Sequence, residues 1–447
     1  MTSAALVLTM AVLFAWGAFA ARLERADLTA PMAFVGVGVL LASLVDFGGQ
    51  AETAAVAALT EATLTWVLFS DAARVGLREL RSDAGIYGRL LGLALPVTVV
   101  VGALCAWWLL GAPGFWVALF VGSALAPTDA ALGAVVISHP AVPARIRRII
   151  NVESGLNDGF VTPIVVLALA GAAATEHGTG GPGTMLAAAL QLAGGALIGI
   201  AVGGGGGWLL RTTERRGWAG ENLAGPAVLA LALLAYAGSV AAHGNGFVAA
   251  FVAGLAFGRV AGRGGPREVF YVEQTAGLVS MLVWMLFGAI GVPVLAGQLS
   301  WQIVLYAVLS LTVIRMAPVA LSLIGTRLGP RTVAFIGWFG PRGLASVVFA
   351  LLAVEELGDE AAPAVAVIVA TVLLSVVAHG VTAGPLAARY GSRETAPEAP
   401  GGHIAPAARL RSAAAAPPDP VPSVPDPIPA AAERSRPDGA SGERGTP

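Results

Sequence analysis

The chain has 447 residues; 56% of them are hydrophobic, only 12% are charged, and the formal net charge is −1. Soluble domains carry roughly 25% charged residues, so this composition excludes an ordinary soluble enzyme. The near-neutral charge gives no basic surface for nucleic acid, and the single cysteine, Cys105, excludes an internal disulfide framework or a multi-cysteine metal site.

Apolar segments long enough to cross a bilayer recur along most of the chain. A membrane-spanning helix needs about 20 mostly apolar residues, and segments of this kind run from Ser3 to about Leu386. We therefore predict an all-α polytopic membrane protein with about thirteen transmembrane helices. The predicted spans are residues 3–21, 29–46, 53–70, 90–110, 115–138, 150–171, 185–210, 224–242, 246–260, 275–294, 301–325, 332–353 and 362–386.

The arginines predict the orientation of these spans. All 26 basic residues are arginines, and almost all of those before Gly391 follow odd-numbered spans. The loops after even-numbered spans hold acidic residues and no arginine. Basic loops stay in the cytoplasm, so we expect the amino terminus outside and the carboxyl terminus inside. Residues 1–16 carry no charge, which argues against a cleaved signal peptide at the first span.

The composition changes at Gly391. Residues 391–447 hold 12 of the 28 prolines and show no apolar periodicity. Such a segment cannot bury a core, so we expect a disordered cytoplasmic tail. The predicted division is a transmembrane domain over residues 1–390 and a tail over residues 391–447.

The sixth predicted span carries the densest set of polar residues, and ionisable groups inside a membrane are functional candidates by default. Helical spacing stacks Glu153 with Asn157 on one face. Ser154, Asp158 and Thr162 stack on the adjoining face, so one polar stripe runs along an otherwise apolar helix. Asp158 lies about 12 Å from the start of the span at 1.5 Å per residue. A carboxylate at that depth needs a cation, a proton or a water-filled cavity.

Two spans are predicted to be broken inside the membrane. Pro127 in the fifth span removes a helical hydrogen-bond donor, which frees backbone groups beside Thr128 and Asp129. The twelfth span contains a second interruption, Gly340-Pro341-Arg342-Gly343. The odd offset between spans five and twelve inverts their orientation, so we expect an inverted-topology repeat with two broken crossing helices. Paired interruptions of this kind are the best sequence indication of a transporter site.

Further charged residues lie at membrane depth. Arg315 in the eleventh span lies too deep to reach the interface easily and must pair with an anion, for which Glu153 is the obvious partner. Arg342 competes for that role, and charge counting leaves the choice open. On the third span, Glu61 and Asp71 are both candidates to reach the cavity.

These segments resemble the monovalent cation/proton antiporter family of the NhaP and NHE type. The most specific match is Glu153-Ser154-Gly155-Leu156-Asn157-Asp158-Gly159, which is similar to the family's signature in its ion-site helix. Thr128-Asp129 fits the family's unwound helix, and residues 340–345 resemble its glycine-arginine-glycine segment in the opposite crossing helix. Residues 244–255 resemble another recurrent helix of the family. The resemblance covers roughly residues 1–390.

The resemblance implies an NhaA-like antiporter fold and a role for each residue of the site. Asp158 would bind the transported cation or a proton, and Asn157 would be its neutral partner, as in electroneutral exchangers. Ser154, Thr128 and Asp129 would help to form the ion site.

Other residues are implied to support this site. Glu153 and Arg315 would form a structural ion pair, with Arg342 as a supporting residue. An acidic residue of the third helix, either Glu61 or Asp71, would lie near the ion.

The predicted function is exchange of a monovalent cation for a proton across the cell membrane, by competition at one buried aspartate. Sodium is the expected cation, with potassium and lithium left open, and a neutral Asn157 favours electroneutral 1:1 exchange. No resident cofactor and no nucleic-acid partner are expected, and the family implies a homodimer. The seventh span carries a ridge of small residues at intervals of four: Gly195, Gly199, Gly203 and Gly207. Such a ridge suits either a subunit contact or packing inside one subunit.

Three other functions compete with this one. A cation channel needs a continuous polar path, but the outer halves of the fifth and sixth spans are largely apolar. An intramembrane enzyme would use Asp129 and Asp158 as a dyad, although the sequence carries neither a two-aspartate protease signature nor paired zinc ligands such as H-E-x-x-H. A membrane receptor or scaffold would use the tail as its effector.

Overall fold

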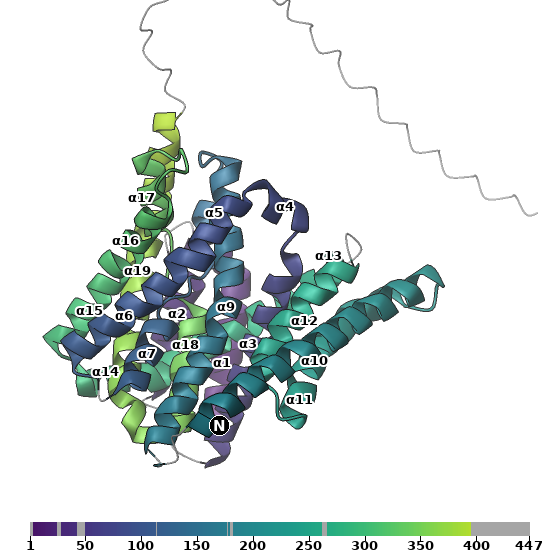
Figure 1. Cartoon of the computed structure of the whole chain (residues 1–447), viewed down its shortest axis with the longest axis horizontal. Helices are drawn as coiled ribbons and strands as arrows, with labels where there is room; N and C mark the ends of the chain where they lie inside the picture. The colour runs from purple at the N-terminus through teal and green to yellow at the C-terminus, as the bar shows by residue number, and fades with distance from the viewer. Residues whose placement is uncertain are drawn as a thin grey trace, which may run out of the picture. The chain divides into compact units, whose positions relative to one another are not determined.

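The structure, a computed structural model, describes residues 3–24, 28–42, 50–112, 114–176, 178, 182–261 and 266–394. Every regular element in these ranges is a helix (Figure 1), which confirms the predicted all-α class. The predicted tail lies outside the described residues from position 395 onward.

The first half of the chain forms α1 (Ser3–Glu24), α2 (Ala30–Ala42), α3 (Gln50–Arg74), α4 (Leu77–Ser82), α5 (Ala84–Arg89), the π-helical turn η1 (Leu90–Ala94), α6 (Leu95–Leu110), α7 (Phe115–Ala124), α8 (Ala134–Ser138) and α9 (Ala144–Glu176). The second half forms α10 (Pro182–Arg215), α11 (Glu221–Ala241), α12 (Gly246–Ala261), α13 (Pro266–Leu286), η3 (Phe287–Gly291), α14 (Val292–Gln298), α15 (Trp301–Leu311), α16 (Val313–Ser322), α17 (Pro330–Trp338), α18 (Leu344–Leu357), η4 (Gly358–Ala361) and α19 (Ala362–Glu394).

Each predicted apolar span contains helix within the residues that the structure describes. Within the described residues, eight helical stretches are long and apolar enough to cross a membrane, and α2, α7 and α12 are shorter apolar helices. The fifth predicted span is split into α7 and α8 around residues 125–133, and the twelfth into α17 and α18 around residues 339–343. Both breaks contain the proline that predicted them, because proline cannot donate to the helical ladder. The number of membrane crossings stays a prediction.

The last helix is longer than predicted. We expected the final span to end near residue 386 and the tail to begin at Gly391, but α19 continues to Glu394. Tyr390 explains the extension, because its ring stacks on Phe335 with centroids 4.3 Å apart and its hydroxyl lies 2.9 Å from the Thr332 hydroxyl. These contacts with α17 hold the last turns of α19 against the bundle.

The helices form two neighbouring groups. Helices α3, α10, α11, α12 and α13 contact one another, and a separate apolar cluster that includes Phe69, Phe257 and Val272 fills the space between them. Helices α5 to α9 and α15 to α19 form the other group. Figure 1 shows α10 along one side of the molecule and α15, α16 and α17 along the opposite side. Helices α3, α9 and α18 contact one another at the junction of the two groups.

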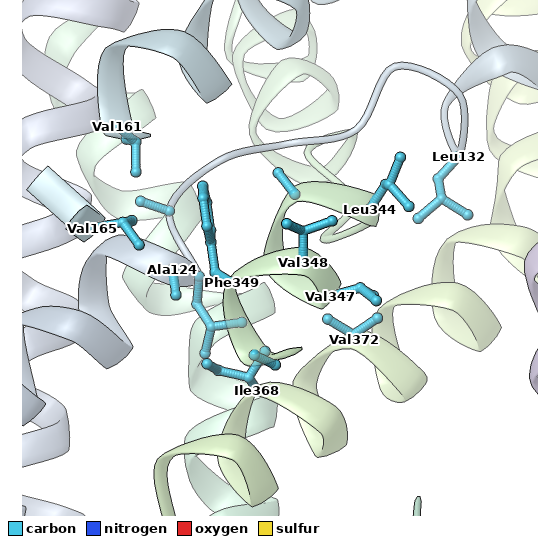
Figure 2. Close-up of a cluster of buried hydrophobic side chains, with 14 of the residues drawn as sticks. Ala124, Leu132, Val161, Val165, Leu344, Val347, Val348, Phe349, Ile368 and Val372 are labelled. Atoms are coloured by element: carbon cyan, nitrogen blue, oxygen red, sulfur yellow. The ribbon is translucent and has the colours of Figure 1, made fainter. Parts of the chain in front are cut away.

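The first break runs through an apolar core. Figure 2 shows buried side chains gathered around it from α7, α9, α18, α19 and the break itself: Ala124, Leu132, Val161, Val165, Leu344, Val347, Val348, Phe349, Ile368 and Val372. Residues 125–128 are themselves buried. Irregular backbone at membrane depth is tolerated where it is buried in protein, so the break lies where its free backbone groups can find protein partners.

The glycine ridge of α10 packs within the chain. A Cβ at Gly199 would lie 2.5 Å from the carbonyl oxygen of Ala249, and a Cβ at Gly203 would overlap the backbone of Ala253. All four ridge glycines face residues 245–260 of the same chain. The sequence left open whether this ridge forms a subunit contact; in the structure it brings α10 close to α12.

Candidate functional site

The two breaks cross and are hydrogen-bonded to each other. The Asp129 amide donates to the Pro341 carbonyl oxygen at 2.8 Å. Each break frees backbone groups that a continuous helix would pair, namely carbonyl groups after α7 and amide groups at the start of α18. Side chains from the opposite break pair with both sets.

Asp129 pairs with the amide end of α18. Its Oδ2 accepts a hydrogen bond from the Leu344 amide at 2.9 Å. Its Oδ1 accepts from the amides of Ala131 at 2.7 Å and Leu132 at 3.4 Å. A carboxylate at a helix N-terminus also interacts favourably with the helix dipole. Both oxygens of Asp129 are therefore engaged by backbone donors.

Arg342 and Ser346 pair with the carbonyl end of α7. Arg342 Nη1 donates to the carbonyl oxygens of Ala126 at 2.6 Å and Pro127 at 3.0 Å. Ser346 Oγ donates to the Ala124 carbonyl oxygen at 2.6 Å. Arg342 is fully buried, so carbonyl dipoles provide the nearest compensation for its charge.

Asn157, Thr128 and Ser154 form one hydrogen-bonded group between α9 and the first break. Asn157 Nδ2 donates to Thr128 Oγ1 at 2.6 Å, and Asn157 Oδ1 accepts from the Thr128 amide at 3.3 Å. The Thr128 hydroxyl lies 2.9 Å from the Ser154 hydroxyl. All three side chains are buried. The Asn157 amide thus holds the break in place and brings the Thr128 and Ser154 hydroxyls together.

Asp158 differs from Asp129 and Asn157 in its hydrogen bonding. The residue is 7% exposed, and Oδ1 is buried without a hydrogen-bond partner among the residues that the structure describes. The negative charges of Asp71, Asp129 and Glu153 act on it. Asp71 lies directly beside α9, because a Cβ at Gly155 would be 3.8 Å from the Asp71 Cβ. Three aspartates therefore meet where α3, α9 and the first break come together.

Glu153 and Arg315 form a buried ion pair. Arg315 Nη2 donates to Glu153 Oε2 at 2.8 Å, and both side chains are 1% exposed. Arg342, the other candidate partner, binds the carbonyl oxygens of the first break instead. The pair lies next to the crossing, since a Cβ at Gly340 would be 2.6 Å from Arg315 Nε.

The structure does not bring Glu61 into this group. Its side chain lies beside Tyr236 of α11, and its charge acts on Glu355 near the end of α18. Asp71, rather than Glu61, is the acidic residue of α3 that lies beside the signature segment of α9.

Comparisons with known proteins identify the family. The family model described as "Sodium/hydrogen exchanger, transmembrane" matches residues 8–389. The chain belongs to this family. Its members are transporters, so the alternative of an intramembrane enzyme is set aside.

Solved structures share the fold of this exchanger-family chain. The sodium proton antiporter MjNhaP1 from Methanocaldococcus jannaschii, solved at pH 8, aligns with a TM-score of 0.68 and 18% identity. That alignment covers 87% of this chain and 98% of the MjNhaP1 chain. An electron-microscopy map of the same antiporter aligns with a TM-score of 0.65. These likenesses confirm the antiporter fold that the resemblance implied.

Curated relatives are antiporters of the same family type. The K(+)/H(+) antiporter NhaP2 of Shewanella oneidensis is 27% identical over 278 residues, which cover 58% of this chain and 44% of the relative. NhaP2 of Shewanella sp. (strain MR-4) is 27% identical over 276 residues, with the same coverage. The chain therefore spans less than half the length of these relatives.

Sequence reasoning missed a charged contact at the start of α9. Arg145 donates twice to Asp83 Oδ1, at 2.9 and 2.7 Å, and Arg148 donates to Asp83 Oδ2 at 3.2 Å. The Asp83 side chain is only 4% exposed. Burial by itself would raise the pKa of Asp83, but the hydrogen bonds and charges of the two arginines hold that pKa below its ordinary value. No spacing rule connects position 83 with position 145.

Sequence reasoning also missed His379, in the middle of α19. Its side chain is 2% exposed, with Nε2 2.9 Å from the Trp338 carbonyl oxygen and Nδ1 3.2 Å from Ser375 Oγ. The sequence did indicate a buried polar pair here, because His379 and, four residues earlier, Ser375 lie inside an apolar span.

Proposed function

We propose that the chain exchanges a monovalent cation for a proton and that the two ions compete at Asp158. The observation that carries this proposal is the contrast between two aspartates of the site. Asp129 accepts three backbone N–H groups, whereas Asp158 Oδ1 is buried without a partner among the described residues. A buried, unpaired carboxylate is unfavourable, so Asp158 is the group that gains most from binding a proton or a cation.

Competition at one carboxylate is sufficient for exchange. A proton neutralises Asp158, and so does a dehydrated cation, but the two do not bind together favourably. The hydroxyl oxygens of Thr128 and Ser154 would complete the ligand set for the cation. An empty site leaves a negative charge in a poorly solvated region, which costs several kcal/mol. The empty form would therefore cross the membrane poorly, and the return step would need the other ion.

The neutral Asn157 supports a 1:1 electroneutral stoichiometry. Its amide is engaged with Thr128, and the Asp129 carboxylate is engaged with backbone donors. Asp158 is then the carboxylate that changes its bound ion in each cycle. Asp71, beside α9, would attract cations toward it.

Sodium is the first cation to test, and potassium is the second. The names of similar proteins point to both, since NhaP2 is a K(+)/H(+) antiporter and MjNhaP1 is a sodium proton antiporter. Both ions, with lithium, therefore belong in the same assay.

The proposal includes an arrangement in the membrane. The amino terminus would lie outside, and the arginine-rich loops would lie in the cytoplasm. Helices α5 to α9 and α15 to α19 would move as one core against the remaining helices, with two copies of the chain forming a dimer. The crossing supports such a core, because its hydrogen bonds join the segments that follow α7 and α17.

The test uses proteoliposomes with an imposed pH gradient and a fluorescent pH probe. Sodium, potassium or lithium should dissipate the gradient with the wild type and fail to do so with Asp158→Asn. Glu61→Gln is the matched control, because Glu61 is also an acidic residue of a membrane helix but lies beside Tyr236. Exchange at the wild-type rate in Asp158→Asn would refute the site. A sodium-driven rate that follows a clamped membrane potential would refute electroneutrality.

A further inference from the structure

A helical hydrogen bond is missing at the second break. In a continuous α-helix, the Arg342 amide would donate to the Trp338 carbonyl oxygen four residues earlier. In the structure, the Arg342 amide turns to α19, and the Trp338 carbonyl oxygen, which accepts from the Gly340 amide at 2.8 Å, also faces α19. The Arg342 amide donates to Ser375 Oγ at 2.7 Å, and the Trp338 carbonyl oxygen lies 2.9 Å from His379 Nε2.

The two α19 residues are joined to each other. Ser375 Oγ lies 3.2 Å from His379 Nδ1. Each ring nitrogen lies 2.9 Å from a carbonyl oxygen, Nε2 from that of Trp338 and Nδ1 from that of Ser375. In the neutral tautomer with its proton on Nε2, the ring donates to the Trp338 carbonyl oxygen, and Nδ1 accepts from the Ser375 hydroxyl. The relay then has one direction: Arg342 amide to Ser375 Oγ, Ser375 hydroxyl to Nδ1, and Nε2–H to the Trp338 carbonyl oxygen. Three hydrogen bonds replace one and keep the same donor and acceptor at the ends.

The charged groups that act on His379 are positive. A ring protonated on Nδ1, whether singly or doubly protonated, would instead donate to the Ser375 carbonyl oxygen. The groups whose charges act on the ring are Arg315 and Arg342, both buried. A third positive charge beside two buried arginines is unfavourable, so the neutral ring that completes the relay fits this environment.

Trp338 is held by α19 at two further points. Its indole Nε1 donates to Thr382 Oγ1 at 3.1 Å, and its ring centroid lies 5.0 Å from that of His379. The end of α17 is therefore attached to α19 through both its backbone and its side chain.

We propose that Ser375 and His379 are positioning residues for the exchange: their relay holds the second break open and thereby keeps Arg342 on the carbonyl oxygens of Ala126 and Pro127. Without the relay, the natural acceptor for the Arg342 amide is again the Trp338 carbonyl oxygen. Re-forming that helical turn would move the guanidinium away from the first break. The carbonyl groups next to the ion site would then lose their donor, and cation binding would weaken.

This proposal rests on the proposed function for its first readout, the apparent KM for sodium in proteoliposomes (for potassium, if the wild type exchanges potassium alone). Ser375→Ala and His379→Leu should each raise this KM about tenfold, the usual order for one buried donor left unpaired. The double variant should be no worse than the more damaged single variant, because both belong to one relay. His379→Gln should stay within about threefold of the wild type, since its amide can accept from Ser375 and donate to Trp338.

Thr371→Val is the matched control. Thr371 is a fully buried residue of the same helix, and its hydroxyl donates to the Val367 carbonyl oxygen at 2.8 Å, within α19. Removing this hydroxyl should leave KM unchanged. A wild-type KM in both Ser375→Ala and His379→Leu would overturn the proposal. Additive effects of the two substitutions on KM in the double variant would also overturn it. Variants that yield less folded protein but keep the wild-type KM would overturn it as well.

A second readout does not depend on transport. Amide hydrogen exchange of the purified full chain should be faster in residues 335–345 of Ser375→Ala and His379→Leu, and unchanged there in His379→Gln and Thr371→Val. Faster amide hydrogen exchange confined to this segment would support the relay even if the wild type moved no cations. A wild type that moves no cations would refute only the proposed function. Unchanged protection of this segment in both relay variants would overturn the proposal.

Discussion

The Glu153–Arg315 pair allows a test of how well its buried charges are compensated. Both side chains are 1% exposed, and one hydrogen bond of 2.8 Å joins Arg315 Nη2 to Glu153 Oε2. Glu153 Oε1 and the Arg315 atoms Nε and Nη1 are buried without a hydrogen-bond partner among the described residues. The pair is incompletely satisfied, and in such pairs the cost of desolvation offsets most of the Coulomb attraction.

Removing one partner should therefore cost much more than removing both. Arg315→Met leaves Glu153 as an isolated buried carboxylate and should lower the free energy of unfolding by about 3–5 kcal/mol. The double variant Glu153→Leu/Arg315→Met removes both charges and keeps apolar volume at both positions. It should unfold within about 1 kcal/mol of the wild type. The second substitution would thus restore most of what the first one loses.

The assay is unfolding of the purified chain by added SDS in mixed micelles, followed by the fluorescence of its 10 tryptophans. Arg331→Met serves as the control, because this arginine is exposed at the start of α17 and should shift stability by no more than about 0.5 kcal/mol. A double variant as unstable as Arg315→Met would show that the pair is a net stabilising interaction. A single variant that loses less than about 1 kcal/mol would mean that Glu153 has other compensation. Either result would refute the reasoning.

Other substitutions test the crossing, the contact at the start of α9 and the α10 ridge. Gly343→Ala places a Cβ in the Asp129 carboxylate. Cation exchange in proteoliposomes should therefore fall about tenfold or more, and gel filtration checks that the variant is folded. A wild-type rate of exchange would contradict the crossing geometry. Asp83→Asn should lower the free energy of unfolding by about 2 kcal/mol at pH 7. Because its folded-state pKa is lowered, Asp83 contributes stability above the ordinary aspartate pKa and loses it as pH falls through the lowered value. The difference from the wild type should therefore close below about pH 4, and a difference that is constant with pH would rule out this origin. Gly203→Ala, whose Cβ overlaps the backbone of α12, should cost about 1–3 kcal/mol. Gly204→Ala, with open space around it, should be neutral or stabilising by up to about 1 kcal/mol; equal effects at the two glycines would argue against the packing of this ridge.

Local signals in the sequence predicted much of this molecule. Pro127 and Pro341 marked both breaks, because the loss of a backbone donor is a property of a single residue. The stripe around Asp158 could be predicted because helical spacing places residues on a face without any knowledge of the neighbours. Apolar length alone located the helices, although α3 and α9 extend several residues beyond the predicted spans.

Partners across space could not be predicted in the same way. Arg315 and Arg342 are both buried cations near the crossing, and the choice between a carboxylate and backbone carbonyl groups depends on where each helix lies. Glu61 and Asp71 are separated by about 15 Å of helix rise, and only the packing of α3 against α9 selects Asp71. The role of His379 depends on a carbonyl group released by a break in a different helix.

Under the proposed function, the crossing explains why Asp158 rather than Asp129 would exchange ions. Arg342 lies at the carbonyl end of one broken helix, and Asp129 lies at the amide end of the other. Each charge faces the helix end whose partial charge is opposite, so the two breaks compensate each other without a mobile ion. Asp158 has no such helix end and no donor on Oδ1 among the described residues. Substitutions in the crossing should therefore change stability and cation affinity together. Asp158→Asn should instead abolish exchange while leaving the free energy of unfolding within about 1 kcal/mol of the wild type or above it, because it removes an unpaired buried charge. A strongly destabilised Asp158→Asn variant would show that this carboxylate has a structural partner after all.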